Sequence, residues 1–296
     1  MKRSRTRRTI VYLGALLLAI FWLGPFVLVG IGSVIPEVNL LSFPPHWFKD
    51  PPTLATYRYI FTGEVPASYE QRGALRSMVS NEVRDVPRAI FNSFVVATAV
   101  MFLNLVLGSL AAYAYARIRF PAKAATFNFV LMSRLIPSVA LAVPYYVIIQ
   151  QLGWLNTYRA LIAIYAVLTL PFTTLVLTLA FRGLPPEIDE AAQVEGASPW
   201  RILKDITVPL ALPNLVGAGL FAFMLAYSEF LFGLFITTTR ERRTLPVILG
   251  SLSANTDVSW GMLMASIAIG AIPTLLLAFP VWRFMVRGLT GGAVRG

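Results

Sequence analysis

Residues 89–116 read AIFNSFVVATAVMFLNLVLGSLAAYAYA, a run without a charged side chain. A helix needs about 20 mainly apolar residues to cross the hydrocarbon core of a bilayer, and this run exceeds that length. Backbone polar groups in lipid must be satisfied within the protein, which favours a helix here. The stretch therefore predicts a transmembrane helix, and the rest of the chain follows the same pattern.

Five other apolar runs have comparable length. Three of them, 10–35, 160–181 and 258–282, contain no charge, whereas 124–151 contains Arg134 and 208–239 contains Glu229. Apolar residues make up 57% of the 296 positions and charged residues 13%, too much apolar surface for a soluble domain to bury. The sequence thus predicts an all-α integral membrane protein with six transmembrane helices.

The net charge of +11 is best explained by membrane topology. The basic residues flank the apolar runs instead of forming one basic face, so a nucleic-acid partner is not expected. With six spans both termini lie on one side, which carries fourteen Lys and Arg against ten opposite, six of those ten in one long loop. By the positive-inside rule, both termini are expected to be cytoplasmic.

The residue inventory excludes several functions. Cysteine is absent and His46 is the single histidine, so disulfides, thiolate metal sites and histidine-based catalytic triads are excluded. No Gly-x-x-x-x-Gly-Lys-Ser/Thr phosphate loop occurs, so this chain is not expected to hydrolyse ATP. We expect neither an enzyme nor a bound cofactor. The first apolar run is too long for a cleaved signal peptide and is expected to remain as a span.

The pattern along the chain predicts a simple organisation. The expected regions are a basic tail and first span (1–35), a proline-rich outer loop (36–88), a five-helix core (89–287) with an inner loop at 182–210, and a C-terminal tail (288–296). Pro137 and Pro144 should kink or interrupt the third span. Residues 239–257 are expected to form a polar outer loop, and the glycine-rich tail is expected to be extended.

The inner loop carries the signals of two short helices. Pro185 and Pro186 suit a first helical turn, and Gly196 can adopt the left-handed conformation that ends a helix. Ser198 is a good N-cap for a second helix. That helix should close at Pro209 and Pro213, where the fifth span begins.

Two interpretations of this loop remain open. In the first, its acidic residues only cap a helix in a solvated connection. In the second, small residues beside a carboxylate insert into a groove on another protein. The residues concerned are Glu190, Ala191, Ala192 and Ala197.

The order Glu190-Ala191-Ala192, then Gly196 and Ile206-Thr-Val-Pro209-Leu, resembles the EAA loop of binding-protein-dependent ABC importer permeases. Other strings are similar to the sugar-permease branch of that family: 111–121 (AAYAYARIRFP), 226–231 (AYSEFL) and 288–295 (GLTGGAVR). The likeness runs from about residue 89 to the end, whereas residues 36–88 match weakly.

The resemblance implies a type I ABC importer permease-like bundle in the cytoplasmic membrane of a prokaryote. The expected partners are a second permease subunit, two ATPase subunits, which use ATP and magnesium, and an external solute-binding protein. Six positions of the loop would contact the ATPase: Glu190, Ala191, Ala192, Gly196, Ala197 and Pro209. Five in the last outer loop would probe the binding protein: Ser253, Ala254, Asn255, Thr256 and Asp257.

Charges inside membrane spans are rare and often functional, which makes Arg134 and Glu229 candidates for the solute pathway. Alternatively, Glu229 extends toward the outer interface. The expected function is ATP-driven import of a sugar or sugar-like solute, and the sequence does not identify which one. A secondary, ion-coupled transporter is the alternative, but such proteins more typically contain paired repeats, which are not evident here.

Overall fold

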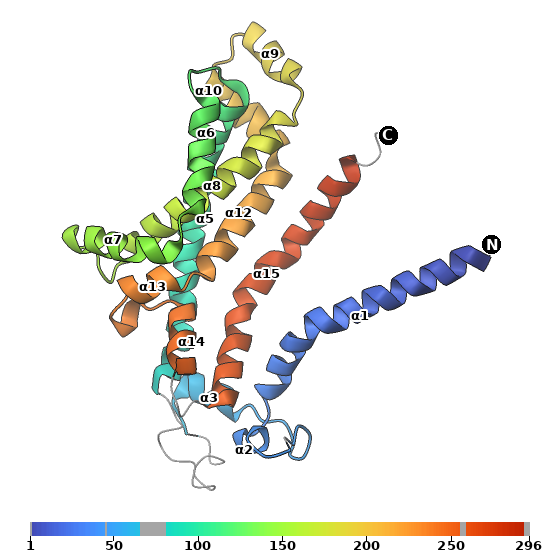
Figure 1. Cartoon of the computed structure of the whole chain (residues 1–296), viewed down its shortest axis with the longest axis vertical. Helices are drawn as coiled ribbons and strands as arrows, with labels where there is room; N and C mark the ends of the chain where they lie inside the picture. Colours follow the sequence, from blue (N-terminus) through green and yellow to red (C-terminus); the bar gives the residue numbers. More distant parts are fainter. Residues whose placement is uncertain (1, 45, 66–80, 255–258, 293–296) are drawn as a thin grey trace. The chain divides into compact units, whose positions relative to one another are not determined.

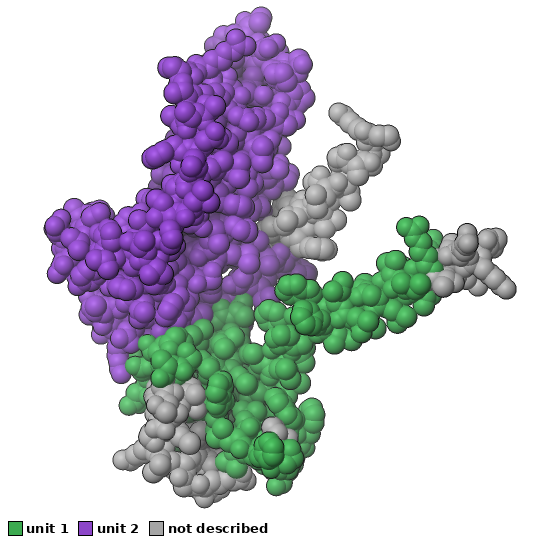
Figure 2. Space-filling view, viewed as in Figure 1, with its two compact units in different colours: residues 1–87, 249–271 green, residues 88–248, 272–296 purple. Residues whose placement is uncertain are grey.

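Every regular element in the described residues is a helix. A computed structural model describes the backbone of residues 2–44, 46–65, 81–254 and 259–292, and the side chains of residues 7–44, 46–65, 81–254 and 259–279. The chain divides into two compact units, shown in Figure 2: unit 1 contains residues 1–87 and 249–271, and unit 2 contains residues 88–248 and 272–296.

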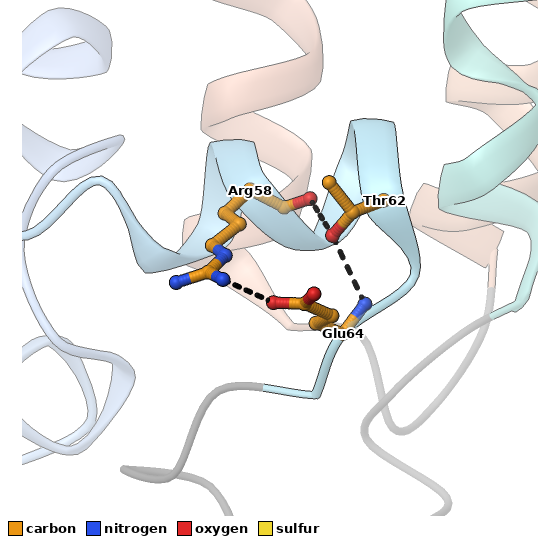
Figure 3. Close-up of polar contacts among 3 residues, drawn as sticks. All are labelled: Arg58, Thr62 and Glu64. Atoms are coloured by element: carbon orange, nitrogen blue, oxygen red, sulfur yellow. Dashed lines mark hydrogen bonds and ion pairs between the residues drawn. The ribbon is translucent and has the colours of Figure 1, made fainter.

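Unit 1 holds the N-terminal helix and the segment that follows it. Its elements are α1 (Lys2–Gly32), α2 (Glu37–Leu40), α3 (Ala55–Thr62) and η2 (Asn81–Asp85), with the end of α14 (Leu245–Ala254) and the first part of α15 (Trp260–Gly292). An ion pair follows α3: Arg58 Nη2 lies 2.6 Å from Glu64 Oε2, both side chains being exposed (Figure 3). The Thr62 hydroxyl donates to the Arg58 carbonyl and accepts from the Glu64 amide.

Most of the helices labelled in Figure 1 belong to unit 2. In chain order its elements are α5 (Val86–Arg117), α6 (Lys123–Met132), η3 (Ser133–Leu135), α7 (Ser138–Gln151), α8 (Tyr158–Arg182), α9 (Pro186–Val194), α10 (Pro199–Ile202), the π-helical turn η4 (Leu203–Thr207), α11 (Val208–Leu210), α12 (Leu212–Tyr227), α13 (Leu231–Ile236) and η5 (Arg240–Arg242), followed by the start of α14 and the end of α15.

The described helices give four to six candidate spans, and six were predicted. Four single helices are long and apolar enough to cross a membrane, in residues 7–32, 81–117, 158–182 and 260–279. Two more spans arise if each of two bent helix pairs counts as one: 123–135 with 138–151, and 199–210 with 212–227. The prediction of an all-helical membrane protein is confirmed.

Both bends lie beside prolines that the sequence singles out. The first pair bends by 97°, and Pro137 caps α7 with an extended backbone (φ −58°, ψ 127°). The second pair bends by 84° at Ala211, between Pro209 and Pro213. A proline has no N–H to continue the preceding helix, so both interruptions follow from the covalent structure of the chain.

The core of unit 2 forms where α5, α8 and α12 pack together. Phe172 of α8 stacks on Phe221 of α12 with ring centroids 4.1 Å apart. A Cβ on Gly108 would lie 2.9 Å from Thr173 Cγ2, so α5 and α8 approach closely at this glycine. Buried hydroxyls of α8 donate to carbonyls of the preceding turn, as Thr178 does to Thr174 at 2.6 Å. The aromatic pair and the approach at Gly108 join α8 to its two neighbours.

Two local predictions are wrong. Residues 245–254 form the apolar helix α14 instead of a polar loop, because Leu245, Val247, Ile248 and Leu252 are all buried. Helix α15 continues to Gly292, so the backbone from residue 288 to that point is helical instead of extended. Glycine lowers helix propensity by only about 1 kcal/mol per residue, which a long helix tolerates near its end.

Candidate functional site

The inner loop folds as a helix–turn–helix, as predicted. Helix α9 begins at Pro186 and ends in a Schellman motif: the Ala197 amide donates to the Ala192 carbonyl at 2.9 Å, and the Gly196 amide to the Gln193 carbonyl at 3.0 Å. Gly196 has φ +84°, the left-handed conformation that favours glycine. The Ser198 hydroxyl then caps α10 by accepting from the Arg201 amide at 3.4 Å. Local sequence therefore determines the shape of this loop.

An ion pair attaches α9 to the end of α5. Arg117 Nε lies 2.8 Å from Asp189 Oδ2, and the two side chains are 14% and 8% exposed. Arg117 also donates through Nη2 to the Leu184 carbonyl at 2.9 Å, so one guanidinium fixes both the start of the loop and α9. Opposite charges this close attract each other more strongly in a largely buried environment than they would in water.

Apolar packing holds the loop to the bundle as well. Ala192 of α9, Ile202 of α10 and Leu203 of η4 belong to the same buried cluster as residues of α5, α8 and α12. The other buried members are Ala112, Tyr113, Leu177, Phe181, Ala211, Leu215 and Ala218. The loop is thus a packed extension of the bundle, and a displacement of α9 would be transmitted to the helices beneath it.

The opposite face of the loop is exposed. Glu190, Ala191 and Gly196 are exposed, and Val194 is 89% exposed although it is apolar. In Figure 1 the loop lies at the same end of unit 2 as the start of α6. The exposed face of α9 thus combines a carboxylate with small and apolar side chains.

The six predicted loop positions divide between the two faces. Glu190, Ala191 and Gly196 lie on the exposed face, as does Pro209 in α11. Ala192 is buried in the chain's own core instead, and Ala197 is half-buried against the same cluster. The helical period explains this division. Ala192 follows Asp189 by three residues, so both lie on the side of α9 that faces the bundle.

Glu229 and Arg134 both lie at helix breaks. The Glu229 carboxylate caps α13, with Oε1 accepting from the Phe232 amide at 3.1 Å and Oε2 from the Gly233 amide at 3.2 Å. Arg134 lies in η3, between α6 and α7, and its side chain is exposed. No ion pair between the two occurs in the described part of the chain. Glu229 therefore has a structural partner, whereas Arg134 faces outward.

The predicted outer contact loop is described only in part. Ser253 and Ala254 end α14, whereas Asn255, Thr256 and Asp257 lie outside the described residues. Immediately after this segment, Glu37 caps α15. Its Oε1 accepts from the Trp260 amide at 2.8 Å, and its Oε2 accepts from the Gly261 amide at 2.7 Å and the Ser259 hydroxyl at 2.9 Å.

Sequence reasoning missed three of these residues. In the sequence, Arg117 looks like one of the basic residues that flank membrane spans, Asp189 looks like an acid near the positive end of a helix, and no motif marks Glu37. Their partners are distant in the chain, Trp260 being 223 residues from Glu37, so no local pattern pairs them. Among the described residues, no three His, Cys, Asp or Glu side chains gather into a group that could hold a metal ion.

Comparison with known proteins identifies the family. Residues 78–287 match the family described as the binding-protein-dependent transport system inner membrane component. The chain is 32% identical over 297 residues to the trehalose/maltose transport system permease protein MalG of Thermococcus litoralis, covering 100% of both chains. It is 30% identical over 285 residues to the sulfoquinovosyl glycerol transport system permease protein SmoH of Agrobacterium fabrum, covering 96% of this chain and 93% of SmoH.

A solved structure shows the same fold. The chain has a TM-score of 0.68 and 17% identity to a chain in the crystal structure of a bacterial ABC transporter involved in the import of the acidic polysaccharide alginate, covering 94% of this chain and 97% of that one. The resemblance drawn from the EAA-type loop is confirmed. The chain belongs to the family of binding-protein-dependent transport system inner membrane components, as a multi-pass permease subunit of an ABC importer whose ATP hydrolysis resides in separate subunits.

Proposed function

We propose that this chain, paired with a second permease subunit, forms the pathway by which a sugar or sugar-like solute enters the cytoplasm. Both full-length relatives described above are named for the transport of such solutes, trehalose/maltose in one case and sulfoquinovosyl glycerol in the other. The complex would also contain two ATPase subunits on the cytoplasmic side and a solute-binding protein on the outer side. Residues 1–35, 36–88, 89–287 and 288–296 would serve as anchor, outer segment, translocation core and tail.

The inner loop is the proposed contact with the ATPase subunit. The observation that carries this proposal is the division of α9 into two faces, one fixed to the bundle by Asp189 and Ala192, the other exposing Glu190 and Ala191. A solvated connection would need neither the anchoring ion pair nor the exposed apolar Val194. We expect Glu190 to pair with a basic residue of the ATPase, and Gly196 to allow close approach.

The coupling would be mechanical. ATP binding brings the two ATPase subunits together, and each docked loop moves with its subunit. Because Arg117 and the buried cluster attach α9 to α5, α8 and α12, that movement would tilt the helices as a body and alternate access to the pathway. The interruption beside Pro137 would let α7 turn independently of this body.

On the outer side, Ser253–Asp257 is the proposed contact with the binding protein. Asn255 and Asp257 offer amide and carboxylate groups that compete for sites built to bind sugar hydroxyls. The Glu37 carboxylate would keep this contact in register by holding the first turn of α15, directly after the loop. Arg134, exposed at a break in the membrane region, would face the pathway or the second permease, whereas Glu229 would maintain the α12–α13 corner.

The function is tested by transport in proteoliposomes. The chain is reconstituted with the second permease, the ATPase subunits and the binding protein, and uptake of radiolabelled trehalose and maltose is measured with and without ATP. We expect uptake that requires ATP and the binding protein together. Uptake driven by an ion gradient, without the ATPase subunits, would contradict the proposal and favour a secondary transporter.

A further inference from the structure

Unit 2 contains an apolar groove that has no role in the proposed contact with the ATPase. It has a volume of about 260 Å³ and lies where α5 meets the segment from α10 to α12. Its lining residues are Phe102, Leu105, Val106, Ser109 and Leu110 of α5, Trp200, Leu203, Lys204 and Val208 of α10 to α11, and Leu215 of α12. We call this the α5–η4 groove.

The groove opens on the exposed face of α5. Phe102, Val106 and Leu110 lie one turn apart on α5, and all three are exposed. A groove with this lining offers an acyl chain dispersion contacts on several sides, which the convex surface of a helix does not. Its shape and composition therefore fit a hydrocarbon chain.

One end of the groove is basic. Lys204 lines it, its side chain is exposed, and no residue in the described ranges pairs with its ammonium group. The neighbouring acid, Asp205, is instead 3.7 Å from Arg201 Nε. Trp200, 62% exposed, lies in the same wall. Exposed tryptophan beside lysine is typical of residues at the level of lipid headgroups.

The depth of the groove agrees with this assignment. Leu110 precedes Arg117, the last residue of α5, by seven residues (117 − 110), which is about 10 Å along a helix. The groove thus extends into the bilayer from the cytoplasmic end of the span, on the orientation given by the positive-inside rule. Anionic lipids attract basic side chains at this surface.

We propose that the α5–η4 groove binds an anionic phospholipid, with one acyl chain along Val106 and Leu110 and the phosphate group at Lys204. Leu203 and Lys204 belong to the π-helical turn that joins the inner loop to α12. The lipid would therefore contact the segment that the proposed function assigns to coupling. Binding itself does not depend on that function and is tested without transport.

The test uses photoreactive lipid. The purified chain is placed in nanodiscs containing trace phosphatidylglycerol with a diazirine in its acyl chain, irradiated, and digested for mass spectrometry. We expect adducts on the peptides that carry Val106 and Leu203. The Lys204→Gln variant should lower this labelling by about fivefold, the loss expected when one surface lysine stops contributing to anionic-lipid binding. Val106→Trp, which fills the groove, should also lower the labelling, although Lys204 is retained.

Lys123→Gln is the matched control, because Lys123 is a cytoplasmic lysine whose ammonium donates to the Ile118 carbonyl at 2.9 Å and does not line the groove. Its labelling should equal that of the parent chain. Phosphatidylcholine carrying the same diazirine should label the groove less and should not respond to Lys204→Gln. Equal labelling by both lipids, or by the parent and Lys204→Gln chains, would overturn the proposal. Loss of labelling on adding the second permease, with a cross-link to it instead, would assign the groove to that subunit.

Discussion

Asp189 Oδ2 lies 2.8 Å from Arg117 Nε, and this contact joins α9 to the end of a membrane span. The pair is largely buried, and Arg117 also holds the Leu184 carbonyl. Under the proposed function, α9 must be rigidly attached to α5, because a flexible connection would absorb movement of the ATPase subunit before it reached the bundle. The first prediction therefore concerns this pair.

Asp189→Asn should destabilise the chain by about 3 kcal/mol, the lower end of the cost of breaking a buried ion pair. It should also reduce ATP-driven uptake more than ATP hydrolysis, because the ATPase can still cycle while α9 transmits less movement. Uptake and hydrolysis are measured together in proteoliposomes, and stability by thermal unfolding in detergent. The double variant Arg117→Leu/Asp189→Leu should recover much of the stability without restoring coupling. Full coupling in Asp189→Asn would reduce the pair to a structural contact.

Two roles are proposed for Gly196, the left-handed turn after α9 and close approach to the ATPase, and substitutions can separate them. A Cβ at this position would meet no atom within 4 Å, so substitution is opposed only by the left-handed φ of +84°. Gly196→Asn should fold nearly as well as the parent, because asparagine tolerates this conformation, whereas Gly196→Val should lose about 1–2 kcal/mol. If Gly196 also packs closely on the ATPase, both variants should lose solute-stimulated ATPase activity. Normal stimulation in Gly196→Asn would show that only the backbone conformation matters.

Arg134→Leu tests whether transport requires the exposed positive charge of Arg134 in the membrane region. Insertion should be unaffected, because the change removes a cost of about 2.5–3.5 kcal/mol on insertion scales. Transport should fall, and Arg134→Lys, which retains the charge, should restore part of it. Membrane integration is followed by protease protection and transport by labelled-solute uptake. Unchanged transport in Arg134→Leu would remove this residue from the pathway.

Glu37→Gln tests the cap on α15. The carboxylate accepts from two backbone amides and one hydroxyl, and an amide side chain has only one accepting oxygen. We expect a loss of about 1–3 kcal/mol for the buried donor left without an acceptor. Glu64→Gln is the matched control in the same outer segment, because its pair with Arg58 is exposed and should contribute about 0–1 kcal/mol (Figure 3). Equal thermal stability of the two variants would contradict the capping role.

The sequence predicts those features that depend on neighbouring residues. Long uncharged runs predict the spans, Pro137 predicts a break, and Gly196 with Ser198 predicts the turn and cap of the inner loop. Each of these follows from the local chemistry of the chain, namely the missing N–H of proline, the left-handed freedom of glycine and the hydroxyl of serine.

The remaining features depend on which distant segments meet. Nothing near Glu37 indicates that it caps a helix beginning at Trp260, and Asp189 by itself looks like any acid in a first helical turn. Glu229 looks like a buried charge until the α12–α13 corner brings two amides to its carboxylate. Residues 239–257 taken together predict a polar loop, whereas residues 245–254 within them form a helix whose apolar side chains are buried.

The central claim is that the exposed face of α9 docks on an ATPase subunit, and site-specific photo-crosslinking tests it most directly. Benzoylphenylalanine is introduced at position 190 in one preparation and at exposed position 64 in another, and the assembled complex is irradiated during ATP turnover. Docking of α9 predicts an adduct with the ATPase subunit at position 190 and none at position 64. An active complex with no ATPase adduct at position 190, or with an adduct at position 64 instead, would contradict it.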